Sequence, residues 1–385
     1  MGSLNPLLLD TGSPPIPAMR TRFAAYDGAH GVPIDLSQAA PGDPPAPALL
    51  AALGAAASDP RLSGYGPLAG ETALRVPFAA ELSRLYGAPI DPAEITITSG
   101  CNQGFFAAML AVARAGDAVL LPTPWYFNHE MALSMLGVAP IPLPCAPEAG
   151  FVPDPEDAAR LIDARTRAIV LVTPNNPTGA IYPPEVIAAF AELCRARGLF
   201  LVLDETYVDF LPDAAQRPHE LFAGDWRSVL LRLSSFSKSY AIPGHRVGSL
   251  VAGPAVQAQL GKVFDTIQIC AHRAAQAALG RSLPALRDWR EANRHEMTAR
   301  AECCRAALAG LNGWQVDSVG AYFAYVRLPP DAPDAWDAAV RLAERGLLAL
   351  PGPAFGPGQQ RHLRIAFANI GRDRMAEIPA RLAML

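Results

Sequence analysis

The stretch that decides the fold is Val229-Leu230-Leu231-Arg232-Leu233-Ser234-Ser235-Phe236-Ser237-Lys238-Ser239-Tyr240-Ala241-Ile242-Pro243-Gly244-His245-Arg246-Val247-Gly248. Its first five residues are mostly apolar and predict a short buried strand, which delivers the polar residues to a loop. In that loop Ser235 and Arg246 can hydrogen-bond and neutralise a phosphate, the guanidinium through its planar fork. Lys238 stands among small polar residues and not among acidic partners, so its amine is available to react.

A reactive lysine beside a phosphate site is the arrangement that pyridoxal 5′-phosphate (PLP) requires, because the amine forms a Schiff base with the cofactor aldehyde. A solvated loop rich in serine and lysine is the alternative for this stretch taken alone. The choice between the two depends on the rest of the chain.

Composition indicates a large globular protein. The 385 residues exceed one ordinary core, which predicts a large domain and a smaller one. Apolar residues make up 51% and charged residues 18%, and the net charge is −4 without a basic stripe, which argues against nucleic acid as a partner. The six cysteines lack metal-binding spacing and indicate reduced thiols in a cytoplasmic protein. We expect no signal peptide and no membrane partner.

Strands and helices alternate through the middle of the chain. Residues 1–45 are expected to be irregular. The predicted strands are 95–98, 118–121, 168–172, 199–203, 229–233 and 248–252, with helices at 47–57, 71–86, 101–114 and 184–197. Such alternation predicts an α/β fold whose mostly parallel sheet is covered by helices on both faces. The last third predicts a smaller α+β domain, with helices through about 279 and at 284–309, strands at 322–327, 347–350 and 363–367, and a helix at 334–344.

Polar residues follow the carboxyl ends of these strands, where ligands bind in such sheets. Asp204 ends a buried strand, and a protonated ring nitrogen of the cofactor would suit its carboxylate; an N-cap or turn aspartate is the alternative. Tyr207 and Asn176 could both donate to the ring oxygen of the cofactor, although a core tyrosine and a turn asparagine remain the plainer readings.

The remaining candidates surround the same site. The turn at residues 99–104, which contains Gly100, Cys101 and Asn102, begins a helix and offers backbone N–H groups to a phosphate. Tyr126 could stack on the pyridine ring, whereas its neighbours Trp125 and Phe127 and the lone His129 are expected to be structural. Arg364 interrupts an apolar strand, and its guanidinium suits a carboxylate.

Together these motifs resemble the class I/II aminotransferases, the fold-type-I PLP enzymes. They occur in the family order: Gly64-Tyr65-Gly66-Pro67 with Gly70, Thr98-Ser99-Gly100, Pro174-Asn175-Asn176-Pro177-Thr178-Gly179, Asp204-Glu205-Thr206-Tyr207, Ser235-x-x-Lys238 with Arg246 and Gly248, Pro351-Gly352-x-x-Phe355-Gly356, and Arg364. The resemblance extends from about residue 34 to the C-terminus. It implies a large PLP-binding domain at residues 46–280, an N-terminal arm at 1–45 and a small C-terminal domain at 281–385.

The resemblance also implies roles. Lys238 would carry the proton between substrate and cofactor, and Arg364 would bind the substrate α-carboxylate, with Asn176 beside it. A homodimer with shared active sites is implied, in which Tyr65 reaches the phosphate of the partner.

The implied reaction is transfer of an amino group between an L-amino acid and a 2-oxo acid. Members that act on acidic substrates carry a lysine where this chain has Asn102, so a large neutral or aromatic side chain is favoured, unless an arginine elsewhere in the dimer supplies the charge. A PLP-dependent lyase, decarboxylase or oxidase on the same fold remains open, as does a non-catalytic PLP-binding regulator. The amino donor and acceptor, the pathway and assembly beyond a dimer do not follow from the sequence.

Overall fold

The computed structural model describes residues 2–213 and 215–385, and in these residues the strands form three sheets. The largest sheet has the order β2-β8-β7-β6-β5-β3-β4. Its strands are β2 (Ile95–Thr98), β3 (Ala118–Thr123), β4 (Ala139–Pro144), β5 (Thr166–Val172), β6 (Phe200–Asp204), β7 (Leu230–Ser235) and β8 (Gly248–Ala252). The two pairings that β8 makes, with β2 and β7, are antiparallel and the other described pairings of this sheet are parallel, so the expected mostly parallel sheet is confirmed.

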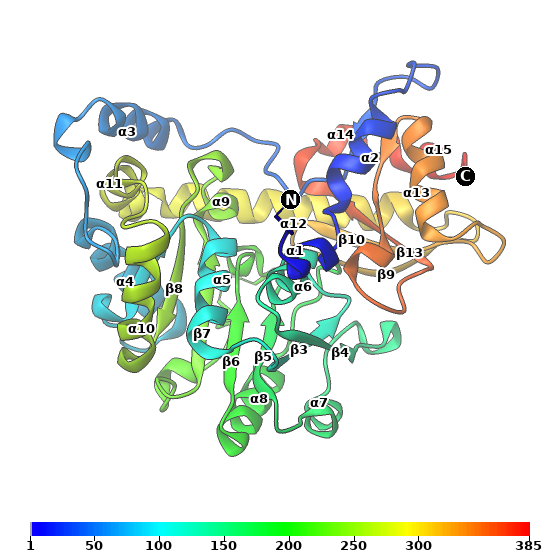
Figure 1. Cartoon of the computed structure of the whole chain (residues 1–385). Helices are drawn as coiled ribbons and strands as arrows, with labels where there is room; N and C mark the ends of the chain where they lie inside the picture. Colours follow the sequence, from blue (N-terminus) through cyan, green and yellow to red (C-terminus); the bar gives the residue numbers. More distant parts are fainter. Residues whose placement is uncertain (1, 214) are drawn as a thin grey trace.

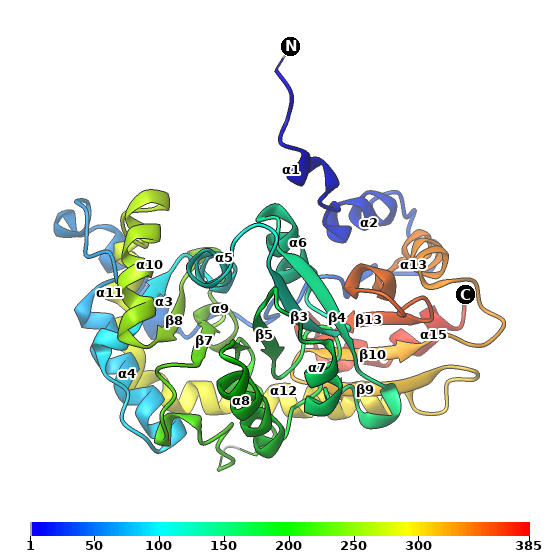
Figure 2. The same cartoon turned by 60° about the horizontal axis from the view of Figure 1, so that its bottom comes forward.

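Helices cover both faces of this sheet (Figures 1 and 2). The helices of the large sheet are α3 (Pro47–Ala57), α4 (Thr72–Tyr86), α5 (Cys101–Val112), α6 (Phe127–Met135), α7 (Pro155–Leu161), α8 (Pro184–Arg197), α10 (Pro254–Ile267) and α11 (Arg273–Ser282), and the short α9 (Phe236–Ser239) follows β7. In β5, Val170 packs in one apolar cluster with α5 and α10, whereas Ile169 and Leu171 pack in another with α8. Each fully buried side chain of this kind contributes about 1.5–3 kcal/mol.

The smaller sheet is antiparallel and has the order β12-β13-β10-β9. Its strands are β9 (Gln315–Gly320), β10 (Phe323–Arg327), β12 (Leu350–Pro351) and β13 (His362–Ala366), and nearby helices are α13 (Ala335–Glu344), α14 (Arg372–Met375) and α15 (Ile378–Leu382). The long helix α12 (Arg287–Leu308) extends from beside the large sheet to beside the small one, and it lies below the small sheet in the view of Figure 2. The boundary expected at residues 280–281 remains a prediction.

The N-terminal segment differs from the expectation. Residues expected to be irregular contain α1 (Pro6–Asp10) and α2 (Pro15–Phe23), and a short strand β1 (Ile34–Asp35). The prolines of this segment favour turns or extended chain, but proline is also tolerated in the first turn of a helix, where its missing N–H needs no partner. The buried Met19 anchors α2 in the main core.

Two other expectations are corrected by strand pairing. The strand predicted at 347–350 is two strands, because β11 (Leu347–Leu348) pairs with β1 while β12 pairs with β13. The strand β4 was not predicted from the sequence, because its three prolines argue against a strand. These prolines are tolerated because β4 lies at the edge of the sheet, where one side needs no ladder hydrogen bonds.

Candidate active site

A cavity of about 560 Å³ lies at the carboxyl ends of the central parallel strands. The last residues of β5, β6 and β7, which are Val172, Asp204 and Ser235, all line it. Further lining side chains are Cys101, Asn102, Tyr126, Asn176, Tyr207, Lys238, Arg246 and Arg364. The structure therefore brings together all the predicted site residues except Gly100, which lies directly before the lining residue Cys101, and Tyr65.

Asp204 is a buried carboxylate with several neighbours. Its Oδ1 accepts from the backbone N–H of Thr206 at 2.9 Å, and its Oδ2 lies 3.4 Å from the Cys101 Sγ and 3.2 Å from the His129 Nε2. Burial would raise the pKa of this carboxyl, but the contacts with His129 and Thr206 outweigh it and lower the pKa below its usual value. Asp204 is therefore an anion at neutral pH and can hold a proton on a neighbouring ring nitrogen.

His129 was expected to be structural, yet it contacts this carboxylate. The imidazole stacks on Phe105 with ring centroids 4.0 Å apart and meets the Tyr126 ring edge-on at 5.2 Å. A signal was present in the sequence: residues 126 and 129 are three apart at the start of α6, and residues at this spacing share one face of a helix.

Lys238 lies on the short helix α9, and among the described residues no carboxylate forms an ion pair with it. Its Nζ instead contacts the backbone oxygen of Ala39 in the N-terminal segment. Burial, with added repulsion from Arg246 and Arg364, lowers the pKa of the amine from 10.5 to about 8. A substantial fraction of this amine is neutral near physiological pH, as a nucleophile and proton carrier requires.

The start of α5 and the loop after β7 form a cradle for an anion. The first-turn N–H groups of α5 have no intrahelical partner, and Gly100 caps the helix with φ of 85°. A Cβ on Gly100 would collide with the guanidinium of Arg246, which lies directly above it. Arg246 itself donates to the backbone oxygens of Pro243 and Ser99 at 2.9 and 3.4 Å.

Arg364 enters the cavity from β13 of the small sheet. It is 2% exposed, and among the described residues no carboxylate pairs with it. Nη1 donates to the Asn176 Oδ1 at 3.0 Å and Nη2 donates to the Ser37 backbone oxygen, whereas the buried Nε has no hydrogen-bond partner in the part of the chain that the structure describes. The guanidinium lies 5.2 and 5.0 Å from the ring centroids of Phe323 and Phe355. Burial lowers its pKa from 12.5 to about 10.

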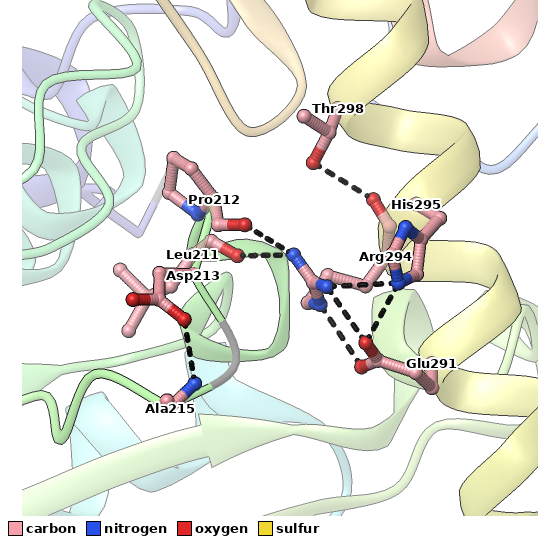
Figure 3. Close-up of polar contacts among 8 residues, drawn as sticks. All are labelled: Leu211, Pro212, Asp213, Ala215, Glu291, Arg294, His295 and Thr298. Carbon is pink, nitrogen blue, oxygen red and sulfur yellow. Dashed lines mark hydrogen bonds and ion pairs between the residues drawn. The ribbon is translucent and has the colours of Figure 1, made fainter.

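Tyr207 lies in a small apolar cluster that also contains Met297 of α12. The ring packs against Tyr322 and Phe323 at 5.3 and 5.2 Å, and burial raises the pKa of its hydroxyl well above 10. Beyond it, Arg294 of α12 contacts the backbone oxygens of Leu211 and Pro212 and forms a two-pronged ion pair with Glu291 (Figure 3). These contacts tie the loop after β6 to α12.

The N-terminal segment supplies cavity residues that the sequence analysis missed: Pro14, Ile16, Pro17, Gln38 and Ala39. In contrast, Tyr65 is 81% exposed and does not line the cavity of its own chain.

Comparison with known proteins decides the family. The family model "Aminotransferase class I and II" matches residues 31–382. The chain belongs to this family. It is 32% identical to the arginine–pyruvate transaminase AruH of Pseudomonas aeruginosa over 89% of this chain and 86% of the relative. It is 30% identical to the valine–pyruvate aminotransferase of Mycobacterium tuberculosis over 95% of both chains.

Solved structures show the same fold. The aspartate aminotransferase of Thermus thermophilus with maleate superposes with a TM-score of 0.91 and 26% identity over the whole of both chains. The Escherichia coli protein YbdL, described as having a methionine aminotransferase function, superposes with a TM-score of 0.90 at 25% identity. This aminotransferase is thus a PLP-dependent enzyme of fold type I.

The cavity of this aminotransferase fits the cofactor of its family. The cradle at Gly100 and Arg246 suits a phosphate, the buried anion Asp204 suits a protonated pyridine nitrogen, and Lys238 has an amine of lowered pKa. The positions of these groups at one rim follow from the parallel sheet, whose strand ends converge there.

Proposed function

We propose that this aminotransferase exchanges an amino group between a neutral L-amino acid, with a large or aromatic side chain favoured, and a 2-oxo acid. The observation that carries the proposal is the set of charges in the cavity. Among the described residues that line it, the cations are Lys238, Arg246 and Arg364, and the single carboxylate is Asp204. Each has a role toward the cofactor or the α-carboxylate, so no charge remains for an ionised substrate side chain.

The other walls support a neutral substrate. Ile16, Pro17 and Phe127 are apolar, and Gln38, Asn102 and Asn128 offer uncharged hydrogen-bonding groups. Burying an ionised side chain against such groups would leave its charge without a partner, which is costly. The relatives named above differ in their amino acids, so substrate choice in this family depends on these walls and not on the fold.

For the cofactor, we assign Ser235, Arg246 and the N–H groups around Gly100, Cys101 and Asn102 to the phosphate. Asp204 holds the proton on the ring nitrogen, and Tyr126 stacks on the ring. Tyr207 and Asn176 donate to the ring oxygen. When bound, PLP supplies the electron sink that makes the α-proton of the substrate acidic.

The remaining roles concern the substrate. Arg364 binds the α-carboxylate with its guanidinium, oriented by Asn176 and by the two aromatic rings. The Lys238 Nζ would then carry the proton from the substrate α-carbon to the aldehyde carbon of the cofactor, a task for which a pKa of about 8 is suited.

The assembly and location complete the proposal. We infer a homodimer in which Tyr65 reaches the phosphate of the other subunit, because its ring is exposed and has no role in its own cavity. Exposed apolar side chains at Leu68, Val76 and Ile267 support an interface nearby. The six cysteines are all free, which supports work in the reducing cytoplasm. No described helix is long and apolar enough to cross a membrane.

A half-reaction tests the substrate assignment. The PLP-loaded enzyme is mixed with single amino acids and no oxo acid, and both the cofactor absorbance and the released 2-oxo acid are followed. We expect stoichiometric release of one oxo acid per site, fastest with a large neutral amino acid. A faster reaction with aspartate, glutamate or arginine would contradict the proposed specificity. Release of ammonia or carbon dioxide with the absorbance restored would contradict transamination itself.

A further inference from the structure

A group of buried polar side chains lies directly behind the rim that carries Asp204. Glu205 follows Asp204, and its Oε2 lies 2.8 Å from the Arg232 Nε and also accepts from the Tyr86 hydroxyl. Arg232 Nε also donates to that hydroxyl at 3.0 Å, and the His219 Nε2 lies 3.5 Å from the Glu205 Oε1. We call these four residues the buried cluster. None of them lines the active-site cavity.

Stability does not account for the buried cluster. The Arg232 and Glu205 side chains are 1% and 0% exposed, and taking two such charges out of water costs about as much as their attraction returns. Apolar side chains of similar size would serve a core equally well. Moreover, Arg232 Nη1 and Glu205 Oε1 have no hydrogen-bond partner among the described residues, which adds to the cost.

The location of the buried cluster suggests what it does. In the sheet register Arg232 stands beside Leu203, and the backbone N–H of Glu205 donates to the Leu233 oxygen at 2.9 Å. The Glu205–Arg232 pair therefore links β6 and β7 one residue beyond Asp204 and three residues before Ser235. Tyr86 attaches the last residue of α4 to the same point.

The charges of this pair persist at any working pH. Burial would raise the pKa of the Glu205 carboxyl, but His219 and Arg232 lower it to about 2. The link is consequently a permanent ion pair with a directional hydrogen bond, which holds a geometry that apolar contacts would leave free to shift.

We propose that Glu205 and Arg232 are positioning residues, which hold the ends of β6 and β7 in the register that aims the Asp204 carboxylate at the ring nitrogen of PLP. The proposal rests on the role proposed above for Asp204. Because Asp204 and Glu205 are adjacent, any shift of the Glu205 backbone moves the aspartate, and an error of a fraction of an ångström weakens a charge-assisted hydrogen bond.

The test uses the double variant Glu205→Leu/Arg232→Met, which removes both charges and leaves no single buried charge behind. The cofactor-free variant is expected to melt close to the wild type. Its dissociation constant for PLP should rise about tenfold, as for other residues that orient a ligand-binding group. The pH midpoint of the bound cofactor's absorbance should shift, because it reports the contact with Asp204, and kcat should fall with little change in KM.

The double variant Glu94→Gln/Arg227→Met is the matched control, because it also removes both charges of one ion pair. Arg227 pairs with the buried Glu94 at 2.5 Å, near the opposite end of β7 and far from the rim. This variant should leave the PLP dissociation constant and the absorbance midpoint unchanged. If it alters them as much as the double variant does, the effect is general to ion pairs of the sheet and the proposal is overturned.

Two further variants separate the outcomes. If the double variant does not fold, Tyr86→Phe removes one hydrogen bond from the cluster and should raise the PLP dissociation constant about threefold, a fraction of one hydrogen bond. Wild-type affinity for PLP and a wild-type absorbance midpoint in either folded variant would overturn the proposal.

Asp204→Asn is measured in parallel. If this variant leaves the absorbance midpoint unchanged, the role of Asp204 itself is wrong. If it alone shifts the midpoint, only the positioning role of the cluster fails.

Discussion

Asp204 and Arg364 are both buried charges of the same cavity, but they reach it from different sheets and have different surroundings. Asp204, at the end of β6, is contacted by a histidine, a thiol and a backbone N–H. Arg364, on β13, faces an amide, a backbone oxygen and two aromatic rings, and its Nε has no hydrogen-bond partner among residues 2–213 and 215–385. The difference fits the roles proposed for the two residues: Asp204 would hold a resident cofactor, whereas Arg364 would keep bonding capacity for a substrate that comes and goes.

The largest effect on activity is expected at Lys238. Its side chain lies in the cavity with both Asp204 of the large sheet (the cofactor side) and Arg364 of the small sheet (the substrate side). Lys238→Ala removes both the nucleophile and the proton carrier, so turnover should fall by about 10⁴-fold or more, as for other enzymes stripped of their central group. Turnover assays and the absorbance spectrum with PLP provide the measurement. Residual activity within about tenfold of the wild type would show that another group carries the proton.

The next largest effect is expected on the cofactor side. Asp204→Asn keeps the shape but removes the negative charge, so the ring nitrogen loses its proton and kcat should fall about 10²–10³-fold. KM for the amino acid should change little, because Arg364 is untouched. A raised KM with an unchanged kcat in this variant would show that Asp204 binds the substrate. The two sheets would then not have separate roles toward cofactor and substrate.

Much of the cofactor side could be predicted from the sequence, because parallel strands place their last residues at one edge. Asp204 and Ser235 were found in this way. The position of Ile16 at the cavity was not foreseen, since nothing local marks its helix as packing near Asp204 or Lys238, which lie far along the chain. Nor was the buried cluster, because Arg232 in an apolar run and Glu205 beside Asp204 give no sign of pairing with each other.

A pH effect on stability is expected from the lysine between the two sides. In the cofactor-free protein the pKa of Lys238 is lowered to about 8, while in the unfolded chain it stays near 10.5. Between these values the unfolded chain binds more protons, so stability rises with pH through this window; below pH 8 the buried ammonium carries a penalty on the order of 3 kcal/mol.

Lys238→Met removes that penalty. Urea unfolding of both cofactor-free proteins at pH 7 and at pH 10 provides the measurement. The variant should gain stability relative to the wild type at pH 7, and the gain should shrink at pH 10. A gain that is equal at both pH values would mean that folding does not lower the pKa of this amine, which would contradict the pKa of about 8 in the folded protein.

The substrate side should respond through binding. Arg364→Met keeps an aliphatic side chain but removes the guanidinium that would bind the α-carboxylate. KM for the amino acid should therefore rise about 10–100-fold, which corresponds to the loss of one or two charge-assisted hydrogen bonds. The PLP content measured after dialysis should match the wild type. Loss of PLP would show that Arg364 belongs to the cofactor side.

The smallest effect is expected from a variant that tests the specificity for the substrate side chain. Asn102→Lys places a cation in a cavity where the three existing cations have other roles. Attraction to a second carboxylate should raise kcat/KM for aspartate or glutamate about tenfold relative to a large neutral amino acid.

Asn128→Lys is the matched control, since it adds the same charge at another lining position. If both variants favour acidic substrates equally, the effect is general attraction by the added charge, and position 102 does not discriminate. If the wild type already prefers a dicarboxylate, a cation from the other subunit reaches the site, and the charges of one chain do not set the specificity.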